Sequence, residues 1–295
     1  MKKALLYDTT LRDGMQGENI FFSTEDKLKI AVRLDEAGIH YIEGGWPGSN
    51  PGAQVFFEKA KEVDFKQAKL AAFGATRRQD RSCEEDVNLA ALINSGAPVV
   101  TIFGKSWDLH VEAIMNNTLA ENLLMIQESI AYLLHHDREV LYDAEHFFDG
   151  YKANASYALK TLEAAVGGGT RCLVLCDTNG GSTPCEIEDI TKAAIAHFKD
   201  RQIEDLIFGI HTHNDCSMAV ANSIQAVHSG ATMVQGTING YGERCGNADL
   251  TSIIPILSLK MNRDCISKEN LGKLLNLSRF VSETANVPPV NSRPF

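Results

Sequence analysis

Short apolar segments with the character of buried strands alternate with longer amphipathic segments, and this unit recurs eight times along the chain. The expected strands cover residues 4–7, 41–45, 69–73, 99–104, 140–144, 172–176, 206–210 and 232–238. The expected helices cover residues 23–37, 53–62, 83–94, 118–135, 155–166, a segment that begins at 184, 218–229 and 249–261. Strands that alternate with helices pair in parallel, because each helix returns the chain to the same end of the sheet. Eight such units in roughly 250 residues predict a (β/α)8 TIM barrel, an α/β fold with a closed sheet.

An open, doubly wound sheet is the alternative fold, since the number of strands alone does not prove closure. A dinucleotide-binding domain of that type needs a Gly-x-Gly-x-x-Gly turn after its first strand, and none follows residues 4–7. The glycine run Gly167–Gly169 does not fit this context, because it ends an expected helix. The barrel is therefore the preferred fold, and it predicts that functional residues follow the strands on one face.

Composition and charge narrow the function classes. The chain has 295 residues, of which 44% are hydrophobic and 22% are charged, and this suits one large domain or two smaller ones. We expect no membrane association, because the sequence holds no run of about 18 apolar residues and the apolar run after Lys2 and Lys3 is too short for a signal peptide. Seven cysteines without a paired framework indicate a reduced, cytoplasmic protein. A net charge of −10 without a basic stripe argues against a nucleic-acid partner.

The C-terminal part differs in character from the rest. We assign residues 1–265 to the barrel, and residues 266–295 to a further helix over Lys268–Glu283 and a proline-rich connector. Pro288, Pro289 and Pro294 predict an extended segment, not a compact end. We therefore expect a connector toward a C-terminal subdomain that this sequence does not include. The numbering leaves open whether the chain is a piece of a longer protein or a naturally short form.

Polar residues follow five of the expected strands. They are Asp8–Gly14, Glu145-His146, Asp177–Asn179, His211–His213 and Gly240–Asn247. Each group alone would be explained by an Asx or Thr turn that caps the next helix. Together, each at the carboxyl end of a strand, they predict a shared site.

Two histidines, His211 and His213, come directly after the apolar run Asp205–Ile210. Side chains at positions i and i+2 of a strand project from the same side, so both imidazoles can reach one metal ion. An isolated His-x-His pair more often makes ordinary hydrogen bonds, and the pair alone leaves that alternative open.

Three motifs together carry a family resemblance. Arg12-Asp13-Gly14, His211-x-His213 and Gly246-Asn247 resemble the motifs of the Claisen-condensing TIM-barrel metalloenzymes, the DRE-TIM metallolyase family. That family includes the 2-isopropylmalate, homocitrate and citramalate synthases and, more distantly, 3-hydroxy-3-methylglutaryl-CoA lyase. The resemblance covers nearly the whole chain.

Two further segments, Ile42–Pro51 and Asp143–Gly150, resemble the citramalate synthase branch most closely. The chain departs from the family pattern at Gly52-Ala53, where a lysine–aspartate pair is expected. This position lies in an expected loop, so we expect the departure to have little effect.

The resemblance implies a divalent cation, Mn, Zn, Co or Mg. The implied ligands are Asp13, His211, His213 and Asn247. One carboxylate, two imidazoles and an amide oxygen form a mixed set that does not select among these metals. The resemblance further implies that the cation chelates a 2-oxo acid and polarises its keto group. Arg12 would then stabilise charge on the keto oxygen, and Thr178 would donate a hydrogen bond to the substrate carboxylate.

Other polar residues near the expected site have two interpretations each. Glu145 is the candidate for proton handling or for orienting Arg12, and the alternative is a salt bridge to Arg12 without proton transfer. Glu43 is expected to be structural, paired with a basic side chain inside the barrel mouth. His146 is expected to be a loop residue.

Cysteines are expected to fill space. Cys172 and Cys176 lie on an expected core strand and should pack inside the barrel. Cys245 stands where a reactive thiol is conceivable, but a small filler beside Gly246 is the more common role.

The activity that the resemblance implies is the condensation of acetyl-CoA with a 2-oxo acid. Pyruvate is the favoured substrate, giving citramalate and CoA for isoleucine biosynthesis, and 2-isopropylmalate or homocitrate synthesis is the alternative. A metal-dependent acyl-CoA lyase or aldolase on the same barrel is a second alternative, which Cys245 keeps open. A third is a barrel that binds metal and oxo acid but turns over slowly, because catalytic residues of the family lie in a C-terminal subdomain. The resemblance also implies a homodimer for the longer form.

Overall fold

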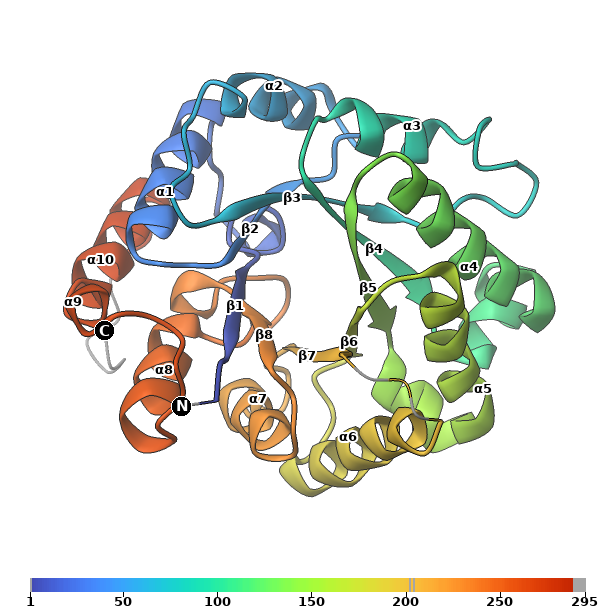
Figure 1. Ribbon diagram of the computed structural model, residues 1–295. Helices are drawn as coiled ribbons and strands as arrows, with labels where there is room; N and C mark the ends of the chain where they lie inside the picture. The colour runs from blue at the N-terminus through green and yellow to red at the C-terminus, as the bar shows by residue number, and fades with distance from the viewer. Residues whose placement is uncertain (1, 202, 204, 289–295) are drawn as a thin grey trace.

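The fold is a closed barrel of parallel strands, as predicted, and the open sheet is excluded (Figure 1). The computed structural model describes residues 2–201, 203 and 205–288. Neighbouring strands pair in sequence order, and β8 pairs back with β1. The strands are β1 (Leu5–Asp8), β2 (Tyr41–Gly45), β3 (Lys69–Ala75), β4 (Val99–Lys105), β5 (Glu139–Glu145), β6 (Cys172–Asp177), β7 (Ile207–Thr212) and β8 (Met233–Gly236).

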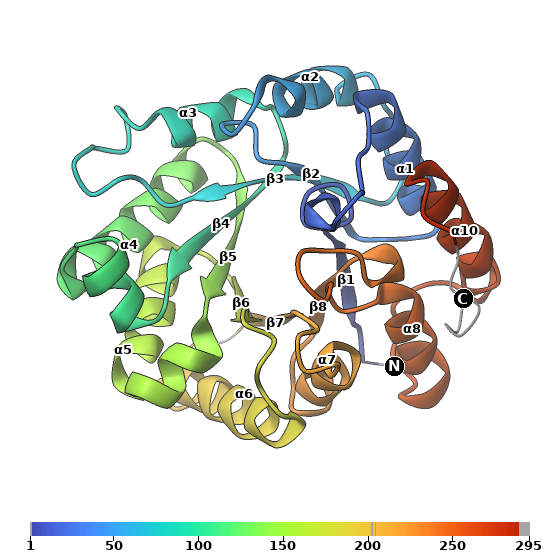
Figure 2. The same ribbon diagram turned by 180° about the vertical axis from the view of Figure 1, so that it is seen from behind.

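Helices surround the strands on all sides, which Figure 2 shows from behind. They are α1 (Thr24–Glu36), α2 (Pro51–Ala60), α3 (Val87–Asn94), α4 (Leu119–His135), α5 (Phe147–Gly168), α6 (Pro184–Lys199), α7 (Ala219–His228), α8 (Leu250–Pro255), α9 (Lys268–Leu271) and α10 (Leu274–Thr284). Local signals explain where several of them begin. Ser23 and Asp26 form a capping box at α1, and Thr183 and Glu186 form one at α6. No helix within the described ranges is long and apolar enough to cross a membrane.

Helix α5 begins well before the expected residue 155. Phe147, Phe148 and Gly150 are buried in its first turn, and the helix kinks at Asn154, whose φ is −151°. The Asn154 side chain accepts a hydrogen bond from Tyr157 N at 3.1 Å and so caps the second half of the helix. The apolar pattern after residue 155 therefore marked only the part that follows the kink.

The C-terminal region packs against the barrel. The expected helix Lys268–Glu283 is divided into α9 and α10 near Gly272, and α10 lies against α1, where the Arg33 guanidinium sits 5.5 Å from the Phe280 ring. The expected proline-rich connector falls mostly on residues 289–295, which lie outside the described residues.

Two apolar clusters form the core. The larger one fills the space between the strands and the surrounding helices. The smaller one fills the barrel interior with Tyr7, Tyr41, Ala71, Val99, Leu141, Cys172, Val174, Cys176 and Met233. The prediction that Cys172 and Cys176 pack in the core is confirmed. Toward the carboxyl ends of the strands the interior becomes polar, with Glu43, Thr101, Asp143, His211 and Gln235 all buried.

Candidate metal centre and active site

The loop after β1 is held against β8. The buried Asp8 carboxylate accepts hydrogen bonds from the backbone N–H and the hydroxyl of Thr10, at 3.0 and 2.8 Å. Thr10 Oγ1 in turn accepts from the backbone N–H of Ile238 at 2.8 Å, just beyond β8. Asp13 follows in this loop, with its own N–H bonded to Thr9 O at 2.9 Å. These contacts fix the direction in which the Asp13 carboxylate points.

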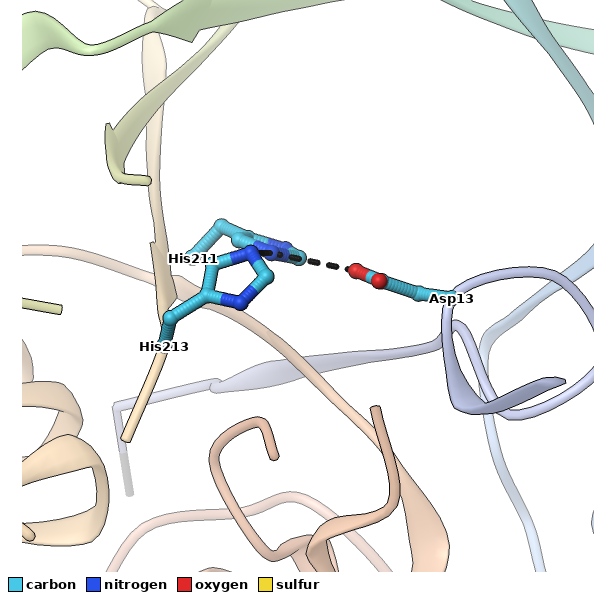
Figure 3. A group of neighbouring side chains, drawn as sticks. All are labelled: Asp13, His211 and His213. Carbon is cyan, nitrogen blue, oxygen red and sulfur yellow. Dashed lines mark hydrogen bonds and ion pairs between the residues drawn. The ribbon is translucent and has the colours of Figure 1, made fainter. Parts of the chain in front are cut away.

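Asp13, His211 and His213 converge at the carboxyl end of the barrel (Figure 3). All three are buried, and one ligand atom from each lies within 4.8 Å of the others. His211 Nε2 is 3.3 Å from Asp13 Oδ2 and 3.3 Å from His213 Nε2. Two atoms bound to one ion at about 2.1 Å with a tetrahedral angle lie about 3.4 Å apart. The spacing of these donor atoms therefore fits a shared cation.

The protonation states depend on the pairing within the triad. Gln235 Oε1 lies 2.9 Å from His211 Nδ1, and because a carbonyl oxygen only accepts, Nδ1 carries a hydrogen. Burial lowers the pKa of His211, but the Asp13 carboxylate outweighs burial and raises it, so Nε2 shares a proton with Asp13 that a metal ion would displace. Burial and the neighbouring His211 lower the pKa of His213 to about 3, so this imidazole is neutral at pH 7. Burial favours the neutral form of Asp13, but Arg12 and His211 outweigh it and hold the pKa of this carboxyl below its ordinary value.

Arg12 is locked by a buried carboxylate. Its Nε donates to Glu43 Oε1 at 2.5 Å, and its guanidinium carbon lies 3.7 Å from the centre of the Phe73 ring. Glu43 is fully buried and also accepts a hydrogen bond from Tyr7 Oη at 2.8 Å. The expectation that Glu43 pairs with a basic side chain in the barrel mouth is confirmed. Burial lowers the pKa of Arg12, but the carboxylates of Glu43 and Asp13 raise it by more than burial lowers it. The guanidinium therefore stays charged.

Glu145 does not orient Arg12, and the suggested salt bridge between the two is wrong. Glu145 is ion-paired with Lys105 instead. The reason is the strand register, in which Lys105 of β4 and Glu145 of β5 stand directly opposite each other. Both groups remain partly exposed, so the carboxylate stays within reach of a ligand.

A cavity of about 190 Å³ unites most of the predicted site residues. Its lining is Arg12, Asp13, Gln16, Phe73, Phe103, Asp143, Glu145, Cys176, Thr178, His211, His213 and Glu243. Thr178 Oγ1 accepts a hydrogen bond from His146 N at 2.9 Å, which leaves its hydroxyl hydrogen for a ligand in the cavity. Burial is the main reason that the pKa of Asp143, on the cavity wall, rises to about 7.

Comparison with known proteins identifies the family. The HMGL-like family model matches residues 3–281. The chain belongs to the HMGL-like family. It is 56% identical to the (R)-citramalate synthase of Aquifex aeolicus over 100% of this chain and 55% of that protein. It is 55% identical to the (R)-citramalate synthase of Geobacter sulfurreducens, over 98% of this chain and 54% of that one.

More distant proteins are also similar. A 2-isopropylmalate synthase of Listeria monocytogenes is 32% identical over 98% of this chain and 54% of its own length. The chain spans about half the length of the curated relatives it matches. A crystal structure of the Bacillus subtilis HMG-CoA lyase shares the fold, with a TM-score of 0.80, 23% identity, and coverage of 99% of this chain and 97% of that one. The resemblance to the citramalate synthase branch is thus confirmed.

In this HMGL-like protein, a buried pair that the motifs did not reveal supports His211. Gln235 stands opposite His211 in the β7–β8 register, and its Nε2 donates to Asp143 Oδ1 at 2.9 Å. The chain His211–Gln235–Asp143 fixes the ring of the first histidine. A glutamine in a strand as short and buried as β8 was the signal that could have identified it, because a buried polar side chain must find partners.

Three further candidates, Asn247, His146 and Cys245, are not part of the lining of this cavity. Asn247 pairs with His213 in an isolated bridge, and its buried Oδ1 has no hydrogen-bond partner among the described residues, so this oxygen is available as a ligand atom. His146 adopts a left-handed conformation, φ 56°, directly before α5, and supports Thr178 through its backbone N–H. Cys245 is exposed and lines a neighbouring cavity of about 440 Å³ with Arg279.

The arrangement combines three side chains that could hold a cation, a fixed guanidinium and the Thr178 hydroxyl around one small cavity. A carboxylate ligand can therefore be held at two points while its neighbouring carbonyl faces positive charge. Glu145, paired with Lys105, lines this cavity together with the carboxylates of Asp143 and Glu243.

Proposed function

We propose that this chain carries the barrel of an enzyme that condenses acetyl-CoA with pyruvate to give citramalate and CoA. The supporting observation is that Asp13, His211 and His213 converge in this chain, all of which aligns with an (R)-citramalate synthase at 56% identity. Identity to 2-isopropylmalate synthases is only 32%, which favours pyruvate over the bulkier 2-oxo acids.

The donor set is proposed to hold a divalent cation through Asp13, His211, His213 and Asn247. When bound there, the cation would act as a Lewis acid toward the keto group of a 2-oxo acid. A mixed set of imidazole, carboxylate and amide oxygen suits several first-row cations, so the metal's identity is left to experiment.

Arg12 and Thr178 would bind and orient the 2-oxo acid. Arg12 cannot swing away, because Glu43 holds its Nε and Phe73 supports the face of its guanidinium. Its remaining N–H groups would stabilise the negative charge that develops on the keto oxygen as the new bond forms. The Thr178 hydroxyl would donate to the substrate carboxylate, while the His146 N–H keeps its oxygen in place.

Glu145 is the proposed proton carrier. It would accept a proton from the methyl group of acetyl-CoA, and the resulting carbon nucleophile would attack the keto carbon of pyruvate. The keto oxygen would take back the proton from Glu145 and become the hydroxyl of the product, and water would then cleave the thioester to give the second carboxylate and CoA. Lys105, opposite Glu145 in the sheet, would hold the carboxylate in position through their ion pair before the transfer.

The test is CoA release, measured by thiol titration, with acetyl-CoA and pyruvate, 2-oxoisovalerate or 2-oxoglutarate in the presence of Mn²⁺. We expect pyruvate to give the highest kcat/KM, with about 10–200-fold selectivity over 2-oxoisovalerate, because extra methyl groups change pocket affinity only moderately. Asp13→Asn serves as the inactive control. Faster CoA release with 2-oxoisovalerate would transfer the assignment to isopropylmalate synthesis.

Relatives about twice as long supply a second comparison. An extended form should bind pyruvate with the same affinity but turn over faster by about 10²–10⁴, if acid–base groups of the family lie beyond the barrel. We also expect that extended form to be a homodimer, which light scattering would measure. Equal turnover in both forms would show that Glu145 and its neighbours suffice.

A further inference from the structure

Three loops at the carboxyl face carry the proposed ligands and substrate contacts. Thr178 lies in the loop after β6, His213 in the loop after β7, and Asn247 in the loop after β8. Backbone hydrogen bonds join these loops in neighbouring pairs, since His213 N donates to Asp177 O at 3.2 Å and Asn214 N to Gly246 O at 2.9 Å. The first and third loops have β7 between them, so they are not neighbours in the barrel.

Arg244 bridges all three loops. Its Nε and Nη2 donate to the two carboxylate oxygens of Asp215 at 2.8 and 3.0 Å, a bidentate pair across to the loop after β7. Nη2 also donates to Thr178 O at 2.9 Å, in the loop after β6. Nη1 donates to Glu243 Oε1 at 2.6 Å, within the loop after β8. A lysine offers no planar fork and could not reproduce this set.

Each of these contacts lies next to a residue of the site. Thr178 accepts the hydrogen bond from Arg244 at its backbone carbonyl. The same residue carries the side-chain hydroxyl that is proposed to bind the substrate. Asp215 comes two positions after His213, and Arg244 comes three positions before Asn247. Glu243 lines the cavity that holds the triad. Arg244 is not among the described residues that line this cavity. It therefore acts on a ligand there only through other residues.

The backbone at Arg244 indicates that the side chain is needed. Its φ is 52°, in the left-handed region that glycine and asparagine adopt readily and that other residues adopt at a cost. An arginine in this conformation gives up local stability, and its charge-assisted bonds to Asp215 are the compensating contacts.

We propose that Arg244 is a positioning residue of the active site. It holds the three loops in the arrangement that brings the Thr178 hydroxyl together with His213 and Asn247, without lining the cavity of the triad. This inference rests on the proposed function only for the identity of the 2-oxo acid. Its effect on cation binding is independent of the reaction.

Arg244→Gly separates positioning from stability. The variant removes the guanidinium but relieves the left-handed backbone, so we expect the Tm to be unchanged or raised. Mn²⁺ affinity, measured by calorimetry, should fall about 10-fold or more, and pyruvate affinity in the presence of Mn²⁺ should fall with it. Arg244→Lys, which keeps the charge but not the fork, should recover only part of the loss. Arg33→Gln, which removes an exposed arginine paired with Glu36 on α1, is the matched control and should change neither affinity.

Unchanged Mn²⁺ and pyruvate affinities in Arg244→Gly would overturn the proposal. Affinities that fall only in step with a lowered Tm would also overturn it, because Arg244 would then be a general stabilising residue. If the wild-type chain binds Mn²⁺ but releases no CoA from acetyl-CoA and pyruvate, the proposed function fails. The comparison of Mn²⁺ affinities would still decide the role of Arg244.

Discussion

Gln235→Leu is the substitution whose effect follows most directly from the geometry of the site. Gln235 is fully buried and makes two hydrogen bonds, one with His211 Nδ1 at 2.9 Å and one to Asp143 Oδ1 at 2.9 Å. Leucine has a similar size but can neither accept from the imidazole nor donate to the carboxylate. The variant therefore tests the support of His211 with little change in packing.

The magnitude can be worked out from the two groups that lose a partner. A buried donor or acceptor left unsatisfied costs about 1–3 kcal/mol. For Asp143 the loss is limited, because burial already raises its pKa to about 7 and the carboxyl can take up a proton. We expect the free energy of unfolding to fall by roughly 2–4 kcal/mol. The imidazole of His211 loses its orientation, so Mn²⁺ affinity should fall about 10–100-fold.

Urea unfolding measures the first quantity and calorimetric titration with Mn²⁺ the second. Gln225→Leu is the matched control, since Gln225 Nε2 donates to Glu188 Oε2 at 2.7 Å far from the cavity. The control should lose about 0.5–1.5 kcal/mol of stability and no Mn²⁺ affinity. A destabilised Gln235→Leu variant that binds Mn²⁺ as tightly as the wild type would refute the reasoning, because the orientation of His211 would then not depend on Gln235.

Three further predictions concern other parts of the molecule. His211→Ala should abolish most Mn²⁺ affinity in calorimetry, and unchanged binding would remove His211 from the ligand set. Glu43→Gln leaves Arg12 and Tyr7 without their buried carboxylate, so urea unfolding should show a loss of about 3–5 kcal/mol; a loss below about 1 kcal/mol would contradict the role of the pair. Burial lowers the pKa of His40 to about 4. Between that value and the ordinary value of about 6.5 the unfolded chain binds more protons than the folded one. The free energy of unfolding therefore falls as the pH is lowered through this window, by up to about 1.4 kcal/mol per pH unit. His40→Gln should flatten this pH dependence in urea titrations, and an unchanged slope would assign it to other groups.

The sequence predicted the parts of the structure that depend on local pattern. The strand Tyr41–Gly45 was placed at its observed bounds, because an apolar run lies between the helix stop at Gly38 and a Pro/Gly loop. The convergence of Asp13, His211 and His213 followed from the barrel, since carboxyl ends of parallel strands share one face, whereas their choice as metal ligands came from the family resemblance. Glu43 was expected to be paired because a charge in a buried strand requires a partner.

The partners themselves could not be predicted, because they depend on strand register and loop path. Glu43 forms an ion pair with Arg12, and Glu145 forms one with Lys105. The spacing of these residues along the chain was equally compatible with an ion pair between Arg12 and Glu145. Register sets Lys105 opposite Glu145. Only the folded sheet decides which inward-facing polar side chains of different strands meet.

The site residues divide into a group on strands and a group on loops, and the two groups should respond differently to substitution. His211, Asp143 and Gln235 lie within strands whose backbone is bonded on both sides, so a change there disturbs buried hydrogen bonds and should lower stability and metal affinity together. Asp13, His213 and Asn247 lie in loops, where the backbone has fewer constraints and side-chain contacts must supply the precision that catalysis needs. The contacts between Asp8 and Thr10 fix the position of Asp13. The bridge made by Arg244 fixes the loops that carry His213 and Asn247. Loss of a loop support should therefore lower affinity with little change in the free energy of unfolding.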